Sequence, residues 1–211
     1  MRTKETTVYQ YNELSEKAKE RARDWFRERN LEYDWYESDY EALQTLGRLF
    51  GMEVDLKRTY FNGFYSQSSG CSFEADIDIV KMFECIRLES WKEEFPNVEF
   101  RFPTQTKNML RVMKIAELLD VRGSVSNANR ETAVRVNLDW DSTDCSGMKS
   151  RDRIDEVMRE IEEYTQDVAE EINNWFYRWL ESDYEYLQSD ESIEEGIIAN
   201  EYEFDEDGRR A

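Results

Sequence analysis

The sequence predicts an α+β fold, with a small antiparallel sheet packed with several helices and a long amphipathic C-terminal helix. Segments of strand-like alternation and of helical spacing follow one another in mixed order, not as a repeating strand–helix alternation. Apolar residues recur every three or four positions from Ile154 to Leu187. The 211 residues are 39% hydrophobic and 14% aromatic, enough for a filled core. We therefore expect a single domain over residues 1–211.

The N-terminal part is expected to contain a short strand and two helices. Val8–Tyr11 has strand character, and Ser15 is a suitable N-cap for a helix that ends near Arg29. A second helix is expected over Tyr33–Phe50, with Gly51 as its stop. We interpret the charges of the first helix as a solvated face with ion pairs across one turn.

The middle of the chain predicts a pair of antiparallel strands. Residues 53–60 and 71–79 alternate apolar and polar side chains, and the Gly- and Ser-rich loop Gly63–Gly70 joins them. Helical spacing returns after the second strand, and one more strand is expected before the long helix. These later elements are two helices over 80–91 and 106–119 and a strand over 133–138.

The negative charge of the chain is concentrated near its C-terminus. Between Glu160 and Asp207 there are eighteen acidic residues and one basic residue, Arg178, so this stretch carries −17 of the net charge of −20. Aromatic residues are interleaved with the acids, whereas disordered acidic segments are poor in aromatics. We therefore expect an ordered surface, made of an acidic helical segment at 152–199 and a strand-like tail at 200–211.

Composition excludes several classes of activity. The chain has no histidine, which removes Ser-His and Cys-His nucleophilic schemes. Cys71, Cys85 and Cys145 form no CxxC pair, as expected for free thiols in a reducing compartment. Neither a signal peptide nor a membrane span is apparent, so a cytoplasmic protein is expected. We expect no enzyme activity, no cofactor and no metal site.

Two acidic motifs resemble cation sites, but we interpret neither of them as one. Asp139–Asp144 resembles the start of a calcium loop, but Asp144 occupies the position of the required Gly and Ser150 that of the bidentate Glu. Asp76 and Asp78 share one face of a strand, and we interpret that face as the solvent side.

An excess of negative charge disfavours nucleic acid and anionic membranes as partners and favours a basic protein. The expected partner is a basic, nucleic-acid-binding host protein, and the sequence leaves a homodimer open. The candidate partner-binding residues are Glu162, Glu163, Asp167, Glu170, Glu171, Glu181, Asp183, Glu185, Asp190, Glu191, Glu194 and Glu195. A second candidate, for a ligand or partner, is the loop with Phe64, Tyr65, Ser66, Gln67, Ser68 and Ser69, whose rings and hydroxyls can stack and hydrogen-bond.

One segment of the sequence is echoed. Trp35–Thr45 recurs as Trp179–Ser189 with eight of eleven positions identical. This is either a convergent amphipathic helix or a pair of equivalent helices about a pseudo-two-fold axis. The echo extends no further, so full duplication is not supported.

Three stretches, 9–19, 63–73 and 201–209, resemble a family of acidic bacteriophage and prophage proteins often labelled antitoxin-like. The relatives have Gly-Asp-Gly after the loop glutamine, where this chain has Ser68-Ser69-Gly70. The resemblance implies a phage accessory protein acting in the bacterial cytoplasm and supplies no catalytic residue.

The leading hypothesis is an anti-defence inhibitor that occupies the nucleic-acid site of a basic host protein by DNA mimicry. Residues 160–188 as a helix would span roughly 43 Å with nine acids, about one per 5 Å, whereas duplex DNA carries one charge per roughly 1.7 Å. Mimicry of a duplex therefore needs the acids after Ser189 as a second row. The alternatives are an antitoxin-like protein that neutralises a toxin through an apolar interface, and a ligand-sequestering protein that uses the 63–73 loop.

Overall fold

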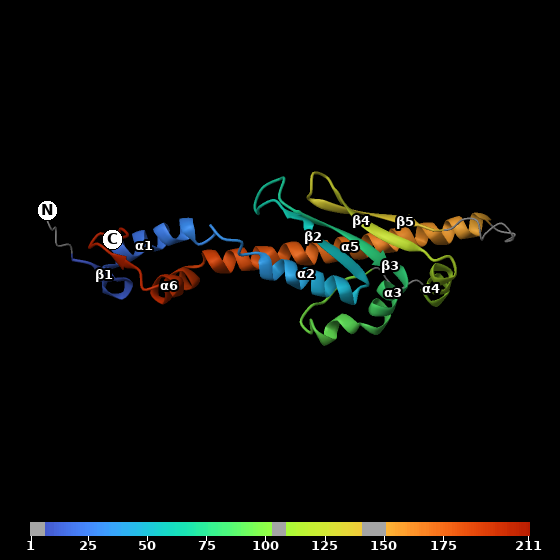
Figure 1. Cartoon of the computed structure of the whole chain (residues 1–211), viewed down its shortest axis with the longest axis horizontal. Coiled ribbons are helices and arrows are strands. Elements are labelled where there is room, and N and C mark those ends of the chain that lie inside the picture. The colour runs from blue at the N-terminus through green and yellow to red at the C-terminus, as the bar shows by residue number, and fades with distance from the viewer. Residues whose placement is uncertain (1–6, 103–108, 141–150) are drawn as a thin grey trace. The chain divides into compact units, whose positions relative to one another are not determined.

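The computed structural model describes residues 7–102, 109–140 and 151–211 and confirms the α+β class (Figure 1). The chain divides into two compact units, each described by itself below. Unit 1 comprises residues 1–37 and 180–211, and unit 2 comprises residues 38–179. The boundary at residues 179 and 180 falls inside one continuous helix, α5 (Arg151–Gln188). The expectation of a single domain stays a prediction. No helix among the described residues is long and apolar enough to cross a membrane.

Unit 2 contains a four-stranded antiparallel sheet. Its order is β2 (Met52–Phe61), β3 (Cys71–Asp78), β4 (Arg122–Ala128) and β5 (Ala133–Asp139). The inward side chains are buried along the strands, whereas polar residues such as Asp76 and Arg135 point to solvent. One face of the sheet is therefore buried and the other is exposed to solvent, as is common for antiparallel sheets.

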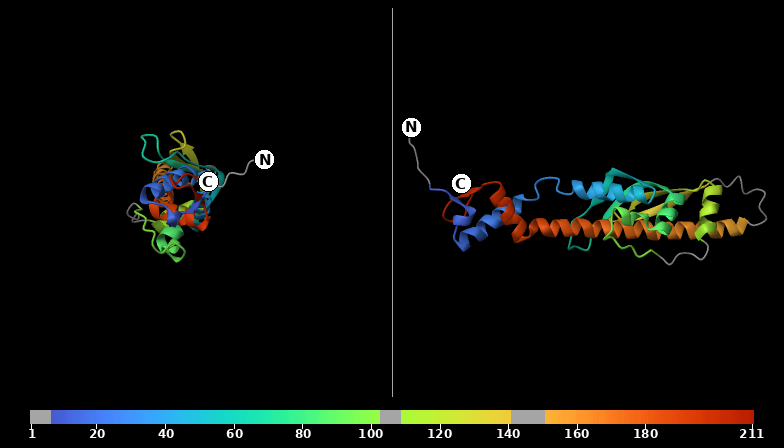
Figure 2. Two further views of the ribbon diagram at one scale, coloured as in Figure 1. Left: turned by 90° about the vertical axis from the view of Figure 1, so that its left-hand side faces the viewer. Right: turned by 90° about the horizontal axis from the view of Figure 1, so that it is seen from below.

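Helix α5 runs along the sheet of unit 2 (Figure 1, Figure 2). Its Tyr164 ring stacks at 5.2 Å on Phe83 of α3 (Ile79–Leu88), and its Phe176 ring lies 5.6 Å from Tyr40 of α2 (Glu37–Leu49). Trp175 meets Phe95 at 5.8 Å, in the segment after α3 and before α4 (Met109–Leu118). Since these buried rings recur at helical spacing, α5 organises the core.

Two amide side chains attach α5 to the sheet. Gln166 Nε2 donates to the Val134 carbonyl at 3.0 Å, and its Oε1 accepts from the Val136 backbone N–H at 2.8 Å. Asn173 is buried, and its Nδ2 donates to the Cys71 carbonyl at 2.9 Å. The Cys71 thiol in turn donates to the Asn173 carbonyl at 3.3 Å. These bonds fix the register of the helix against β3 and β5.

Unit 1 is built from short elements around one apolar cluster. The elements are β1 (Tyr9–Gln10), a 3-10 turn (Tyr11–Glu13), α1 (Glu16–Arg29), α6 (Asp190–Ala199), β6 (Glu203–Phe204) and the end of α5. β1 pairs with β6 in antiparallel register. The cluster consists of Tyr11, Leu14, Ala18, Ala22, Phe26, Ile193, Ile197 and Phe204.

Most predicted elements are confirmed. Ser15 caps α1 by accepting the Ala18 N–H, and α1 ends at Arg29 as expected. The tail after α6 forms an edge strand, as predicted from its alternation. Cys71 and Cys85 are free and buried, and Cys145 lies outside the described residues.

Three boundaries or elements were predicted wrongly. α2 begins at Glu37, four residues later than predicted. Ile79 opens α3 and does not end β3, because the Asp78 side chain accepts the Lys81 N–H and caps the helix. Strand β4 was missed, because its sequence RGSVSNA has few of the β-branched and aromatic residues that mark a strand.

Candidate functional site

Five acids form a straight row on the outward side of α5. They are Glu156, Glu160, Glu163, Asp167 and Glu170, which we call the acidic seam. Their spacing of four, three, four and three residues keeps them on one helix face. The opposite face is buried through Ile161, Val168 and Ile172. The same amphipathic pattern that buries α5 in unit 2 therefore aligns these carboxylates in solvent.

Within the described part of the chain, the seam keeps its negative charge. Among the residues that the structure describes, no lysine or arginine forms an ion pair with a seam carboxylate. The nearest polar contact is Gln166 Nε2, which donates to Glu170 Oε1 at 2.7 Å. The pKa of Asp167 is raised by burial and then by the charges of Glu170 and Glu163. Like charges three and four residues apart destabilise a helix by about 0.2–0.5 kcal/mol per pair.

Over residues 155–171, which contain the acidic seam, the density of acids along the helix is higher than over residues 160–188. Between Asp155 and Glu171 the helix carries eight acids and one base, Arg159. This segment is roughly 24 Å long, so the acids follow one another about every 3 Å. One strand of DNA carries a charge about every 3.4 Å of axis, and a duplex about every 1.7 Å. The segment matches one strand in charge density, and not a duplex.

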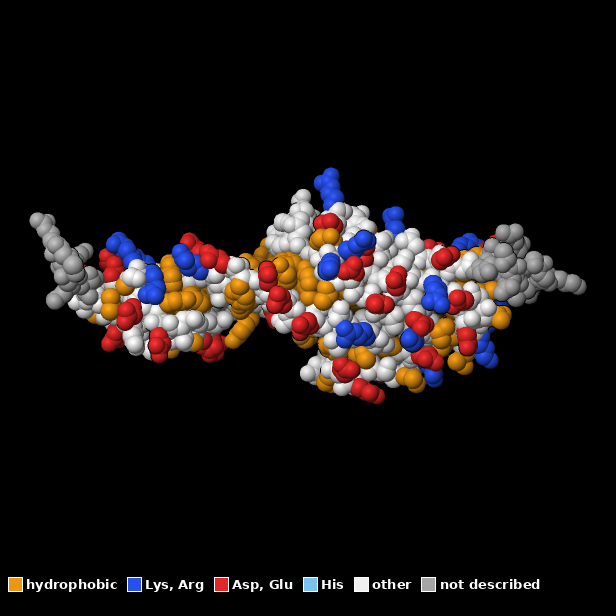
Figure 3. Space-filling view, in the orientation of Figure 1, with side chains coloured by type: hydrophobic (Ala, Val, Ile, Leu, Met, Phe, Trp, Pro, Cys, Tyr) orange, Lys and Arg blue, Asp and Glu red, His pale blue; other side chains and the backbone are white. Residues whose placement is uncertain are grey.

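Of the other candidate acids on α5, Glu162 is exposed, whereas Glu171 is half-buried and accepts the Arg101 backbone N–H at 3.2 Å. Glu181, Asp183 and Glu185 belong to unit 1. Figure 3 shows acidic and basic side chains interspersed on the drawn face of unit 2, in contrast to the single-signed seam.

Two of the four acids expected in the second row are paired within unit 1. Asp190 of α6 pairs with Arg27 at 2.6 Å and with Arg23 at 3.9 Å, and Glu194 pairs with Arg23 at 2.8 Å. Glu191 and Glu195 are exposed on α6. The expected pair across one turn of α1, Asp24–Arg27, is present at 2.7 Å, and packing of α1 on α6 gives Arg23 and Arg27 further counter-charges in Glu194 and Asp190.

The centre of this pairing is a three-membered network in unit 1. Tyr11 Oη donates to Glu194 Oε1 at 2.8 Å, and Arg23 Nη1 donates to Tyr11 Oη at 3.1 Å. Burial, and then the hydrogen bond to Glu194, raise the pKa of Tyr11 to about 12. The hydrogen bond from Tyr11, followed by that from Arg23, lowers the pKa of Glu194. The network joins the 3-10 turn, α1 and α6.

Unit 1 should therefore lose stability at both ends of the pH range. The folded-state pKa of Glu194 is depressed, so its contribution is present above pH 4.5 and is lost as the pH falls through its folded pKa. The folded-state pKa of Tyr11 is raised, so its contribution is present below pH 10 and is lost as the pH rises toward 12. Hydrogen exchange of α1 and α6 against pH measures both branches.

Tyr11 and Glu194 are coupled, so each substitution should affect both branches of this pH dependence. Glu194→Gln should remove the acid branch and reduce the alkaline one, because the hydrogen bond to Glu194 is the second cause of the raised pKa of Tyr11. Its cost near neutral pH should be about 1 kcal/mol because the carboxylate is partly exposed. Tyr11→Phe should remove the alkaline branch and weaken the acid branch, because the hydrogen bond from Tyr11 is the main cause of the lowered pKa of Glu194. An unchanged acid branch in the Glu194→Gln variant would contradict this assignment.

The predicted ligand loop is occupied largely by its own contacts. Phe64 stacks on Phe61 at 6.0 Å and lies 5.4 Å from Tyr177 of α5, whose hydroxyl donates to the Gly63 carbonyl. The hydroxyls of Ser66, Ser68 and Ser69 contact one another at 2.9–3.3 Å. Gln67 is exposed, and the Tyr65 side chain is 70% exposed. The loop thus closes the β2–β3 hairpin, and Tyr65 is its most exposed ring.

The echoed segments contact each other in a reciprocal way. Trp179, the first residue of the second copy, donates through Nε1 to Asp39, the fifth residue of the first copy, at 3.1 Å. Trp35, the first residue of the first copy, lies 6.1 Å from Tyr184, the sixth residue of the second. Asp39 is buried, so the echo stabilises an internal contact. It does not present the same surface twice.

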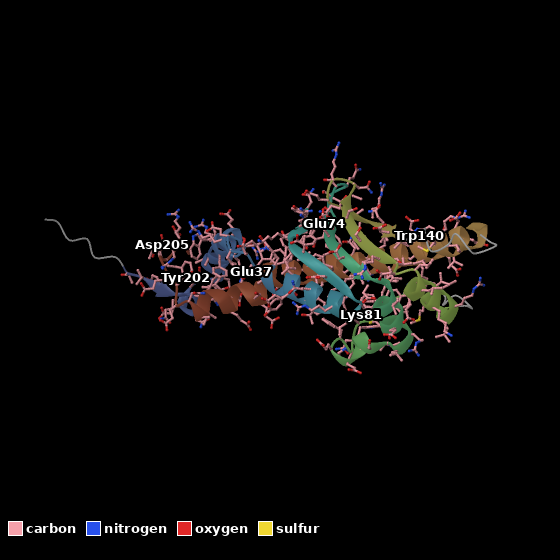
Figure 4. The ribbon with its side chains drawn as sticks, turned by 45° about the vertical axis from the view of Figure 1, so that its right-hand side comes forward. Glu37, Glu74, Lys81, Trp140, Tyr202 and Asp205 are labelled. Atoms are coloured by element: carbon pink, nitrogen blue, oxygen red, sulfur yellow. The ribbon has the colours of Figure 1, made fainter. Side chains whose placement is uncertain are left out.

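The solvent face of the sheet carries acids that serve local structure. Asp78 caps α3 and pairs with Lys81 at 3.4 Å, and Glu74 pairs with Arg58 at 2.7 Å; Figure 4 labels Lys81 and Glu74. In the described part of the chain, no group of three or more His, Cys, Asp or Glu side chains could hold a metal ion. The rejected calcium motif lies largely outside the described residues.

Comparison with known proteins places the chain in a family. Residues 35–190 match a family model described as a domain of unknown function, DUF8835, and since this covers most of the chain, the chain belongs to that family. No curated protein and no solved structure matches the chain. The matched range begins at the first echoed tryptophan and includes the acidic seam. It leaves out α1, most of α6 and both strands of unit 1.

Proposed function

We propose that this DUF8835 protein is a binding protein that holds a basic protein against the acidic seam of α5, in place of one strand of nucleic acid. The observation that carries the proposal is the row of carboxylates from Glu156 to Glu170, none of which has an ion-pair partner among the described residues. The proposed activity is inhibition by occupancy, without catalysis.

The seam favours a cationic partner for an energetic reason. Its carboxylates repel one another along the helix, and the raised pKa of Asp167 records part of that repulsion. Lysine and arginine side chains of a partner would relieve the repulsion and add charge-assisted hydrogen bonds. The same field would accelerate encounter with a basic surface and repel nucleic acid.

Charge density narrows the kind of partner. Over residues 155–171, one acid about every 3 Å resembles a single strand, and two of the four α6 acids, Asp190 and Glu194, are paired with α1 arginines. A protein that grips one strand through its phosphates therefore fits better than one that encloses a duplex. The resemblance to acidic bacteriophage proteins supports a nucleic-acid-binding or defence protein of a bacterial host as the target, met in the host cytoplasm.

Neutralising the seam tests the proposal. The variant Glu156→Gln, Glu163→Gln, Asp167→Asn and Glu170→Gln removes four charges while keeping side-chain size. We expect it to weaken partner binding by about fourfold to a thousandfold, because four exposed ion pairs are worth about 0.2–1 kcal/mol each. Capture from bacterial lysate by immobilised protein, eluted with a salt gradient, identifies the partner, and titration of that partner measures the loss.

A matched control separates the seam from net charge. Glu20, Glu28, Glu41 and Glu84 are exposed and form no ion pair among the described residues, and their replacement by Gln changes the net charge equally. This control should bind as the parent does. Capture that persists at high salt and in the seam variant would overturn the proposal and favour the antitoxin-like alternative with an apolar interface.

A further inference from the structure

Unit 1 contains a groove of about 760 Å³ that is separate from the seam. It lies between α1 and the segment around and after α6, and its floor and walls include Trp25, Arg29, Tyr33, Asn200, Tyr202 and Arg210. Figure 4 labels Tyr202. All its lining residues fall outside residues 35–190, the range that matches the family model. The volume is in the range of pockets for small organic ligands, about 300–1,000 Å³.

Aromatic rings and guanidinium groups are paired in this groove. Trp25 and Tyr202 meet edge to face at 5.2 Å. The Arg29 guanidinium lies 5.5 Å from the Trp25 ring centroid, and the Arg210 guanidinium lies 4.9 Å from that of Tyr202. Tyr33 is 57% exposed at the same groove. Such surfaces accept a flat ring, because both aromatic faces and guanidinium planes stack on it.

Arg29 and Arg210 differ in their ion pairs from the arginines next to them in unit 1. The neighbouring Arg21, Arg23 and Arg27 of α1 each form an ion pair with an acid of the C-terminal segment. By contrast, neither Arg29 nor Arg210 has a carboxylate partner within ion-pair distance among the described residues, although the chain has 48 acids and 28 bases. Arg210 donates one N–H to the Glu203 carbonyl. The remaining guanidinium donors suit an anion.

We propose that this groove binds a nucleoside monophosphate. The base would stack among Trp25, Tyr33 and Tyr202, and the phosphate would take the donors of Arg29 and Arg210. Asn30, Glu32 and Asn200 also line the groove and offer donors and acceptors for the edge of a base. A longer nucleic acid is disfavoured, because its phosphates would meet the acidic C-terminal segment. A ligand with one phosphate is favoured over one with several, because Glu32 offsets part of the charge of the two arginines.

Isothermal titration calorimetry of the full chain with AMP, GMP, CMP and UMP tests the proposal, with inorganic phosphate and adenosine as separate arms. We expect saturable binding of at least one nucleotide, and neither phosphate nor adenosine alone should bind comparably. Arg29→Gln and Arg210→Gln should each weaken binding at least tenfold. Lys17→Gln removes one charge from an exposed position of α1 and should change affinity less than twofold.

Circular dichroism and thermal unfolding establish that each variant is folded before its affinity is compared. Three results would overturn the proposal: no saturable heat with any of the four nucleotides, binding that both arginine variants retain, or equal affinity for inorganic phosphate. None of these results depends on the acidic seam, so the test is independent of the proposed function.

Discussion

Replacing Phe176 by alanine should lower the free energy of unfolding by about 3–5 kcal/mol, the usual cost of truncating a buried aromatic side chain. The Phe176 side chain is fully buried, and its ring packs against Tyr40 between α5 and α2. Because Phe176 is fully buried, its truncation would leave a cavity between α5 and α2. The melting temperature should fall by about 10 °C, as measured by calorimetry or circular dichroism.

Tyr186→Ala is the matched control for this variant. Tyr186 lies on the same helix, and its side chain is 55% exposed. Its backbone carbonyl, which accepts from Ser189, is kept in the variant. The melting temperature should change by less than about 2 °C, since exposed substitutions cost about 0.5 kcal/mol or less. Similar losses in the two variants would contradict the burial that we assign to Phe176.

Gly208→Ala should disrupt the C-terminal end of unit 1 and cost about 2–4 kcal/mol. Gly208 has φ +81°, and an added Cβ would lie 2.0 Å from the Ala18 carbonyl oxygen of α1. Backbone cannot move aside there without displacing α1. Hydrogen exchange should therefore accelerate over β1 and β6, which pair with each other, while the sheet of unit 2 keeps its protection.

Gly63→Ala is the control that distinguishes the strain of a positive φ from the steric contact between residue 208 and α1. Gly63 also has a positive φ of +57°, but an added Cβ there meets nothing within 4 Å. Only the strain of the left-handed conformation remains, which costs about 1 kcal/mol. If both variants lost equal stability, the contact between Gly208 and α1 would not be the cause.

The sequence predicted the fold wherever a local rule and the tertiary structure agree. Ser15 and Ser189 are good N-caps by residue type, and both cap helices. Within unit 2, the stripe from Ile154 to Phe176 is buried, and it contacts the sheet, α2 and α3. β4 could not be predicted, because Gly123 and Ser124 owe their extended conformation to pairing with β3 and β5. Such pairing is a non-local interaction.

The candidate site was predicted in part. Glu163, Asp167 and Glu170 were identified from charge alone, whereas Glu156 and Glu160 were missed. Their helical spacing of seven and three residues to Glu163 was the signal that would have included them. Asp190 and Glu194 were identified as free acids, and only the packing of α6 on α1 reveals their arginine partners. Side-chain periodicity is a local property, but neutralisation depends on residues far apart in sequence.

The side-chain amide of Gln166 limits the association of copies of this protein through the edge of the sheet. It occupies the carbonyl of Val134 and the N–H of Val136 on β5, the last strand of the sheet order. An outermost strand normally offers such groups to a strand of another chain, which leads to aggregation. Here the Gln166 side chain of α5 forms the two hydrogen bonds that such a strand would form. The Gln166 side chain therefore protects this edge against self-association, in addition to the exposed charge of Arg135 on the same strand.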